Sequence, residues 1–251
     1  MKTFSSFSRL MLLCLVCSFS MSAFSQGVAI YKKDGTMVKY SYEEIDSIVT
    51  YNYGEEPVTP VTYEAVDLGL SVKWATFNVG ATKPEEYGGY YAWGETEEKE
   101  DYSLETYKWC NGTSISITKY CTDSSDGTVD NKTVLDLEDD VAHVKWGGDW
   151  RMPTNAEQDE LRNNCSWTWT TQNGVKGYNV TGPNGNSIFL PAAGYRNGTD
   201  VSNGGYYGSY WSGSLDSYYS SDACGLRFNI NYYGCYSNSR CCGRSVRPVS
   251  K

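Results

Sequence analysis

Histidine, CxxC cysteine pairs and long apolar runs are rare or missing in this chain of 251 residues. His143 is its one histidine, so a Ser/His/Asp or Cys/His catalytic arrangement would have to be built around that residue. One histidine, and no CxxC spacing beyond Cys14 and Cys17 in the first 25 residues, disfavour a zinc site. Gly147-Gly148 lacks the Lys and Ser/Thr that follow in a phosphate-binding loop. We therefore expect no metal, no cofactor and no catalytic residue.

Basic residues are also scarce. The chain has 21 Lys and Arg residues against 30 Asp and Glu residues, for a formal net charge of -9. Glu160 is the last glutamate, so the C-terminal part is mildly basic, but Arg240, Arg244 and Arg247 are too few for a phosphate-binding track. The sequence thus indicates no nucleic-acid partner.

The first 25 residues have the pattern of a secretory signal peptide. Lys2 and Arg9 supply positive charge, residues 10–16 (LMLLCLV) supply a short apolar run, and Ala23 and Ser25 have the spacing that signal peptidase reads. That run is too short for a stable membrane span, and no later stretch approaches the needed length. We expect an exported protein, secreted or held at the cell surface, without a membrane span after cleavage. A lipid anchor stays open.

Seven cysteines remain once this segment is removed. Export permits disulfide bonds, and an odd count leaves at least one thiol unpaired. Cys110 and Cys121 lie on the two sides of an expected loop, so we predict a bridge between them. The pairing of the other cysteines stays open.

The rest of the chain divides into a short unit, a linker and one domain. Residues 26–53 read as a small β-hairpin unit around Asp34-Gly35, a dipeptide that favours a hairpin turn. Residues 54–62 (GEEPVTPVT) have the composition of a linker. Residues 63–251 form the main domain.

Hydrophobic periodicity predicts helices and short strands in this domain. Apolar residues alternate over 67–75, which predicts a strand. They recur at helical spacing from Val134 to Val144, and a capping box at Thr154 begins a second helix that runs to about residue 164. Short strands are expected over 167–171, 175–181, 187–190 and 223–231. The fold class that we predict is α+β, with two helices and mixed short strands.

Residues 205–243 have a composition that suits binding. They include eight Tyr, eight Ser and six Gly, and no Lys or Glu. Antibody-type paratopes share this composition, because tyrosine offers large rigid contacts and small polar residues offer adaptable hydrogen bonds. For any single tyrosine the alternative is a strand surface without a ligand, since tyrosine favours strands in general.

The strand expected over 223–231 has two distinct faces. Its even-numbered residues, among them Leu226 and Phe228, share one face that should pack on a core. Its odd-numbered residues share the other face, which should meet solvent and ligand. The ligand-binding residues that we predict are Tyr206, Tyr207, Tyr218, Tyr219, Arg227, Asn229, Asn231, Tyr232, Tyr233, Tyr236 and Asn238.

Several motifs carry a family resemblance. They are VDLGLSVKWA (66–75), WGE (93–95), WGGDWRMPT (146–154), LPAAGYR (190–196), YWS (210–212) and GRSVRPV (243–249). The chain resembles the Fibrobacter succinogenes major paralogous domain over about residues 63–251. The resemblance implies a C-type-lectin-like fold and export by a Gram-negative bacterium.

Some members of that family are variable proteins of diversity-generating retroelements, in which adenines of a template are randomised. Adenine changes in an Asn codon yield Tyr, Ser, Asp, Gly, Cys and Arg, among others, and these residue types crowd 205–242. On this hypothesis Cys235, Cys241 and Cys242 are sampled variants. The sequence departs from calcium-dependent lectins, because residues 210–213 (YWSG) lack the acidic ligands.

We therefore expect an adhesin-like surface or secreted protein that binds a protein or glycan ligand without catalysis. Two alternatives remain open. One is a glycan-processing enzyme that uses carboxylates, either Glu138, Asp139 and Asp140 or Asp159 and Glu160. The other is a structural envelope protein without a specific ligand. The sequence does not identify the ligand or the oligomeric state.

Overall fold

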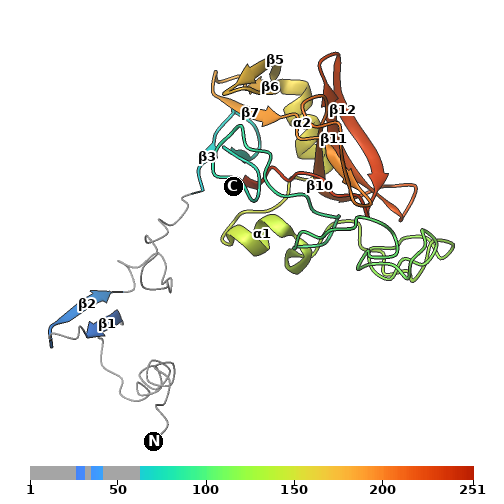
Figure 1. Ribbon diagram of the computed structural model, residues 1–251, viewed down its shortest axis with the longest axis horizontal. Helices are drawn as coiled ribbons and strands as arrows, with labels where there is room; N and C mark the ends of the chain where they lie inside the picture. Colours follow the sequence, from blue (N-terminus) through green and yellow to red (C-terminus); the bar gives the residue numbers. More distant parts are fainter. Residues whose placement is uncertain (1–26, 32–34, 42–62) are drawn as a thin grey trace, which may run out of the picture. The chain divides into compact units, whose positions relative to one another are not determined.

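The computed structural model describes residues 27–31, 35–41 and 63–251 (Figure 1). The chain divides into two units, residues 1–60 and 61–251. In the first unit, β1 (Gly27–Tyr31) pairs antiparallel with β2 (Met37–Ser41) on the two sides of Gly35, which has a φ of 85°. The expected signal peptide (1–25) and the expected linker (54–62) lie outside the described residues. Of the unit expected over 26–53, the structure describes residues 27–31 and 35–41.

The second unit contains short strands and two α-helices. The helices are α1 (Val141–Trp146), preceded by a 3-10 turn (Leu137–Asp139), and α2 (Asn155–Asn164). The strands are β3 (Ala65–Val66), β4 (Lys73–Ala75), β5 (Ser166–Gln172), β6 (Val175–Thr181), β7 (Ser187–Pro191), β8 (Tyr195–Asn197), β9 (Asp200–Ser202), β10 (Gly208–Leu215), β11 (Asp222–Asn229), β12 (Tyr232–Ser239) and β13 (Val249–Ser250).

These strands form several small antiparallel sheets. Two are consecutive meanders, β5-β6-β7 and β10-β11-β12, and β8 pairs with β9. The third three-stranded sheet has the order β13-β4-β3, so the last strand of the chain pairs with the first part of the unit. Figure 1 shows the C-terminus in the same region as β3, the other edge strand of this sheet.

The predicted α+β, C-type-lectin-like class is wrong, because the unit is mostly β. Of the described residues, 38% lie in strands and 10% in helices. The helix predicted from Val134 to Val144 accounts for much of the difference. The Asp140 carboxylate accepts hydrogen bonds from the Ala142 and His143 amides, so it caps α1 and makes the helix begin at Val141. Val134 instead forms a β-bridge with Ser214.

The strand predicted over 67–75 is also interrupted. The Gly69 amide donates to the Asp67 carboxylate at 2.7 Å, and Gly69 has a φ of 75°. This is an Asx turn, which the small polar side chain of Asp favours over a continuous strand. The alternating residues therefore lie in β3, a turn and β4.

Other elements match the sequence pattern closely. Thr154 and Glu157 form the predicted capping box at the start of α2. The Asn173-Gly174 turn between β5 and β6 has positive φ at both residues, 49° and 85°, as a tight hairpin turn requires. The meander β5-β6-β7 thus forms where it was predicted, within a residue or two.

The sheet β10-β11-β12 lies between two hydrophobic cores. On its first side, Tyr210, Leu226 and Phe228 join a cluster with residues of β4, α2, β6 and β7. On its second side, Trp211 and Ala223 join another cluster, whose members include residues of the segment between β4 and α1 (76–140). The second core covers β10 and one end of β11 and leaves part of the second side, mainly on β12, open.

No helix within the described residues combines the length and the apolar character that a membrane crossing requires.

Candidate functional site

The open part of this sheet brings together five of the predicted ligand-binding residues. In the antiparallel register, Arg227 pairs with Gly234, Asn229 with Tyr232 and Gly225 with Tyr236. Paired residues share one side of a sheet and alternate residues along a strand share it too. Five residues thus lie on or beside the second side and form what we call the tyrosine–arginine face: Tyr207, Arg227, Tyr232, Tyr236 and Asn238.

Aromatic and cationic contacts hold this face together. The Arg227 guanidinium carbon lies 4.8 Å from the centroid of the Tyr207 ring, within the range of a cation–π contact. The Tyr232 and Tyr236 ring centroids are 6.1 Å apart in an edge-to-face arrangement. Burial raises the pKa of the Tyr232 phenol, an effect that nearby Arg227 opposes. The hydroxyl therefore stays protonated at neutral pH and can donate a hydrogen bond.

Two predicted residues serve the scaffold instead. Tyr233 lies on the first side of the sheet, where its ring stacks on Trp167 with centroids 4.6 Å apart and planes 10° from parallel. The Asn229 side-chain oxygen Oδ1 accepts hydrogen bonds from the backbone amides of Asn231 and Tyr232 at 2.8 and 3.2 Å. Asn229 therefore shapes the β11–β12 turn. The strand predicted over 223–231 ends at Asn229, two residues earlier than expected.

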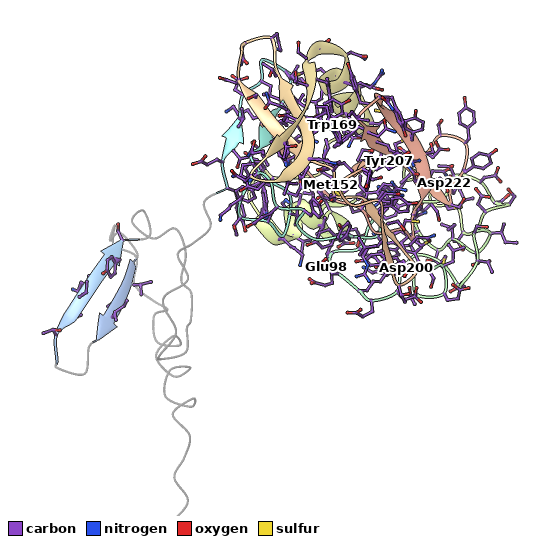
Figure 2. The ribbon with its side chains drawn as sticks, turned by 45° about the horizontal axis from the view of Figure 1, so that its top comes forward. Glu98, Met152, Trp169, Asp200, Tyr207 and Asp222 are labelled. Carbon is purple, nitrogen blue, oxygen red and sulfur yellow. The ribbon has the colours of Figure 1, made fainter. Side chains whose placement is uncertain are left out.

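The remaining predicted residues lie at the two ends of the sheet. Tyr206 and Asn231 are exposed at the end that Tyr207 marks, where the Lys176 ammonium lies 5.5 Å from the Tyr206 ring centroid. Tyr218 and Tyr219 lie at the opposite end, beside Asp222; Figure 2 labels Tyr207 and Asp222. The eight residues of β11 cover roughly 24 Å at roughly 3.4 Å per residue, so one compact ligand would not reach both ends.

Tyr218 and Tyr219 form a separate exposed pair, which we call the distal pair. Their amides donate to one carboxylate oxygen of Asp216 at 2.8 and 2.9 Å, which fixes the turn after β10. Their side chains project into solvent, with exposed fractions of 83% and 63%. The distal pair has the exposure of a contact site, but no cation of the described residues lies over either ring as Arg227 lies over Tyr207.

Sequence reasoning missed Arg244. Its side chain is buried and its guanidinium carbon lies 4.7 Å from the Trp211 ring centroid and 5.5 Å from that of Tyr195. It donates a hydrogen bond to the Ser209 hydroxyl. Ser209 pairs directly with Arg227 across β10 and β11, so Arg244 lies at the border of the tyrosine–arginine face. Its place within the GRSVRPV motif carried no signal that it borders a ligand face.

The seven cysteines within residues 63–251 are free in the structure. The thiol of Cys110 donates to the Leu104 carbonyl oxygen at 3.0 Å, and that of Cys121 donates to the Asp123 carbonyl oxygen at 3.1 Å. The two sulfurs that we predicted to form a bridge thus have separate backbone partners. A hydrogen bond from the neighbouring Cys242 lowers the pKa of the Cys241 thiol.

The carboxylates of the enzyme alternative already have structural partners. Asp140 also accepts from the Met152 amide at 2.8 Å, in addition to capping α1. Asp159 pairs with Arg162 at 2.9 Å, and Glu160 accepts from the Ser71 amide at 3.0 Å. His143 lies with its Nδ1 atom 3.3 Å from the Trp150 carbonyl oxygen. These contacts position loops and helix ends, which is a structural use of each group.

Asp136, Glu138 and Asp139 bring carboxylate oxygens within 4.8 Å of one another. The Lys119 ammonium lies among them, at 2.8 Å from Asp136, 3.4 Å from Glu138 and 2.6 Å from Asp139. A divalent cation would have to displace this ammonium, so the donor set suits a lysine better than a metal.

A small hollow of about 140 Å³ lies elsewhere, on the sheet β5-β6-β7. Its lining includes Gln172, Asn179 and Phe189, and no residue of the tyrosine–arginine face contributes to it. We give more weight to the face, because it gathers aromatic, cationic and amide groups on one exposed surface.

A comparison with protein families matches the segment that carries this face. Residues 142–249 are similar to a family described as a domain of unknown function, DUF8237. The matched segment begins in α1, ends in β13, and contains Arg244 and every residue of the tyrosine–arginine face. Neither the curated proteins nor the solved structures gave a match. The residues themselves therefore carry the functional argument.

Proposed function

We propose that this protein is an exported, adhesin-like binding protein that contacts a ligand through the tyrosine–arginine face and performs no catalysis. One observation carries the proposal. The face collects half-buried Tyr207 and Tyr232 and exposed Tyr236 beside Arg227, on the open part of one side of a sheet whose other side packs on a core. Tyrosine and arginine are the residue types enriched in binding hot spots.

The scaffold beneath supports a pre-organised surface. Phe228 is fully buried and packs against the rings of Tyr210, Tyr178 and Trp167. Strand β11, which carries Arg227, is therefore held on its first side by a dense aromatic cluster. A rigid contact surface loses less conformational entropy on binding than a flexible one.

Export is the part of the proposal that rests on the sequence of residues 1–25. N-terminal sequencing of the protein from its native host tests it, with Gln26 as the expected first residue of the secreted form. An intact N-terminus at Met1 would contradict export by this route.

Diversification by a retroelement is a further part of the proposal. Burial limits the positions at which we propose variation. Tyr and Arg are among the residue types that adenine changes produce, but Tyr210 and Arg240 are fully buried and belong to the scaffold. The positions that would vary are exposed ones such as Tyr206, Tyr218 and Tyr236. A template repeat near the gene, with adenines at the codons of these positions, is the expected finding, and its absence would remove this part alone.

The binding proposal is tested by screening the purified protein on glycan and protein arrays. A triple variant, Tyr207→Ala, Tyr232→Ala and Tyr236→Ala, removes the rings of the face. A matched control, Tyr218→Ala and Tyr219→Ala, removes the distal pair, which is at least as exposed. Each hot-spot tyrosine contributes about 2 kcal/mol, so the triple variant should lose the ligand, while the control should bind within about threefold of wild type.

Circular dichroism and thermal melting verify that both variants are folded. A triple variant that binds as wild type does would place the site elsewhere. Loss of binding in the control alone would move the site to the distal pair. A wild-type protein that binds nothing on either array would favour the structural envelope alternative.

A further inference from the structure

Arg244 is a buried cation whose hydrogen-bonding capacity is largely unused. It is 5% exposed, and its Nε atom is buried without a hydrogen-bond partner. A guanidinium has five N–H donors, and burying a charge without compensating partners is costly. Within the described residues, the Arg244 side chain donates one hydrogen bond, to the Ser209 hydroxyl.

Two other buried arginines close by in sequence show what a saturated guanidinium looks like in this fold. Arg247 donates to the carbonyl oxygens of Ala75, Thr76 and Phe189 and to the Asn78 side chain, at 2.9 to 3.1 Å. Arg240 likewise donates to three carbonyl oxygens and to a tyrosine hydroxyl. Arg240 and Arg247 thus hold separate backbone segments together through their hydrogen bonds, whereas the Arg244 side chain donates to no backbone carbonyl oxygen within the described residues.

Arg227 is a second cation without an anionic partner. The arginines that form ion pairs in the described part of the chain are Arg151 and Arg162. Arg227 contacts the Tyr207 ring. It pairs across the strands with Ser209, to which Arg244 donates a hydrogen bond, so the two cations lie on the same side of the sheet and repel each other. Burial and, to a smaller degree, Arg227 lower the pKa of Arg244 to about 10, so both side chains remain charged at neutral pH.

Two neighbouring guanidinium groups, one of them buried with an unused donor, form a site of positive potential beside three tyrosines. Asp222 attracts Arg244 weakly and lies toward the far end of the sheet. Arginine forms its strongest hydrogen bonds with carboxylates, often through two donors at once. An anionic group placed between the two arginines would relieve their repulsion.

We propose that Arg227 and Arg244 together bind the carboxylate of a sugar acid, a uronate unit of an acidic polysaccharide laid across the tyrosine–arginine face. The inference rests on the proposed binding function and specifies the ligand class.

The position of the two arginines favours a flat ring over an extended acidic peptide. A peptide that adds to the sheet would pair with the free edge of β12, since β12 pairs with β11 on its other side. Arg227 lies on the central strand, and Arg244 lies beside Ser209 on β10, at the opposite edge. A ligand that reaches both must lie across the strands on the sheet surface. Pyranose rings do so by packing on tyrosine rings while their hydroxyls meet the phenols of Tyr207 and Tyr232.

The probe is D-glucuronate, titrated into the ¹⁵N-labelled full protein while the Arg Nε–H resonances are followed by NMR. Arg227→Gln is the first variant, because this residue is half-buried and makes no hydrogen bond within the described residues. Arg244→Lys is the second, and Arg162→Gln on α2, on the opposite side of the sheet, is the matched control. D-Glucose, acetate and tetraglutamate are the comparison ligands.

Glucuronate should shift the Arg227 and Arg244 resonances saturably, and glucose and acetate should bind about tenfold more weakly or not at all. Arg227→Gln and Arg244→Lys should each weaken glucuronate by about tenfold, the loss of one charge-assisted hydrogen bond, and Arg162→Gln should bind like wild type. Equal binding of glucose or acetate, tighter binding of tetraglutamate, or no saturable shift would overturn the inference. If array binding depended on the tyrosines but glucuronate shifted no arginine resonance, the proposed function would be supported and the uronate inference alone would be wrong.

Discussion

The two sides of the sheet β10-β11-β12 should separate stability from binding, and Phe228 and Tyr236 test this. Phe228 is 0% exposed. Its ring stacks on Tyr210 with centroids 5.8 Å apart and meets the edges of Tyr178 and Trp167 at 5.3 and 6.1 Å. Tyr236 is 47% exposed and has one ring neighbour, Tyr232.

The magnitude for Phe228→Ala follows from these contacts. A buried Phe→Ala change costs about 3–5 kcal/mol through lost burial and the cavity that remains. Because several aromatic pairs are lost at once, and each adds about 0.5–1.5 kcal/mol beyond burial, we expect the upper part of that range. Tyr236→Ala removes one such pair from a half-exposed position and should cost about 0.5–1 kcal/mol.

Urea unfolding followed by tryptophan fluorescence measures both changes. With an m-value of about 2–3 kcal/mol/M, Phe228→Ala should lower the midpoint by about 1–2 M and Tyr236→Ala by less than about 0.5 M. Phe228→Leu, which keeps much of the volume, should lie between them. A Phe228→Ala loss below about 1.5 kcal/mol, or a Tyr236→Ala loss above about 2 kcal/mol, would show that the inward and outward sides have been assigned the wrong way round.

Three further predictions follow from local geometry. Hydrogen bonds from Lys119 and then Lys132 lower the pKa of Asp136 from 3.8 to about 2. The ionised Asp136 carboxylate therefore stabilises the fold above pH 3.8, and this stabilisation is lost as the pH falls to about 2. The free energy of unfolding of Asp136→Asn, measured across this pH range, should fall by about 1 kcal/mol less than that of wild type, after allowance for solvent screening. Gly208→Ala should cost about 1–3 kcal/mol in urea unfolding, because its Cβ would lie 1.9 Å from the Phe228 ring; an unchanged midpoint would contradict this packing. Thr154→Ala should cost about 1 kcal/mol by calorimetry, because it removes the cap of α2, whereas Thr154→Ser should cost little.

Local patterns predicted several elements well. The capping box located α2, and the Asn173-Gly174 turn located the β5–β6 hairpin, because both signals act within a few residues of chain. The alternation correctly placed Leu226 and Phe228 in a core. It was wrong for Ile230, which is exposed, and for Ala223, which is buried on the face expected to meet solvent. The helix expected from Val134 was wrong because the Asp140 side chain supplied a competing hydrogen-bond pattern.

The structure brings together part of the predicted set of ligand-binding residues. Composition identified residues 205–243, and Tyr207, Arg227, Tyr232 and Tyr236 do meet on one side of the sheet. Composition could not separate them from Tyr233, which lies on the opposite side and stacks on a tryptophan of β5. That outcome depends on a partner strand more than 60 residues away in sequence, so no local pattern carries it.

The order of short-range elements along the chain was determined by the sequence itself, because caps, tight turns and strand alternation are set by neighbouring residues. Strand register and the packing of separate sheets decided the rest. They divided the tyrosines between two sides and two ends of one sheet, and they buried Arg240 and Arg247 among backbone carbonyls. They also brought Arg244 to Ser209, the cross-strand partner of Arg227, although 16 residues separate the two arginines along the chain. Contacts of this kind form between distant segments, and their energies depend on which surfaces meet when the chain closes on itself through β13 and β4.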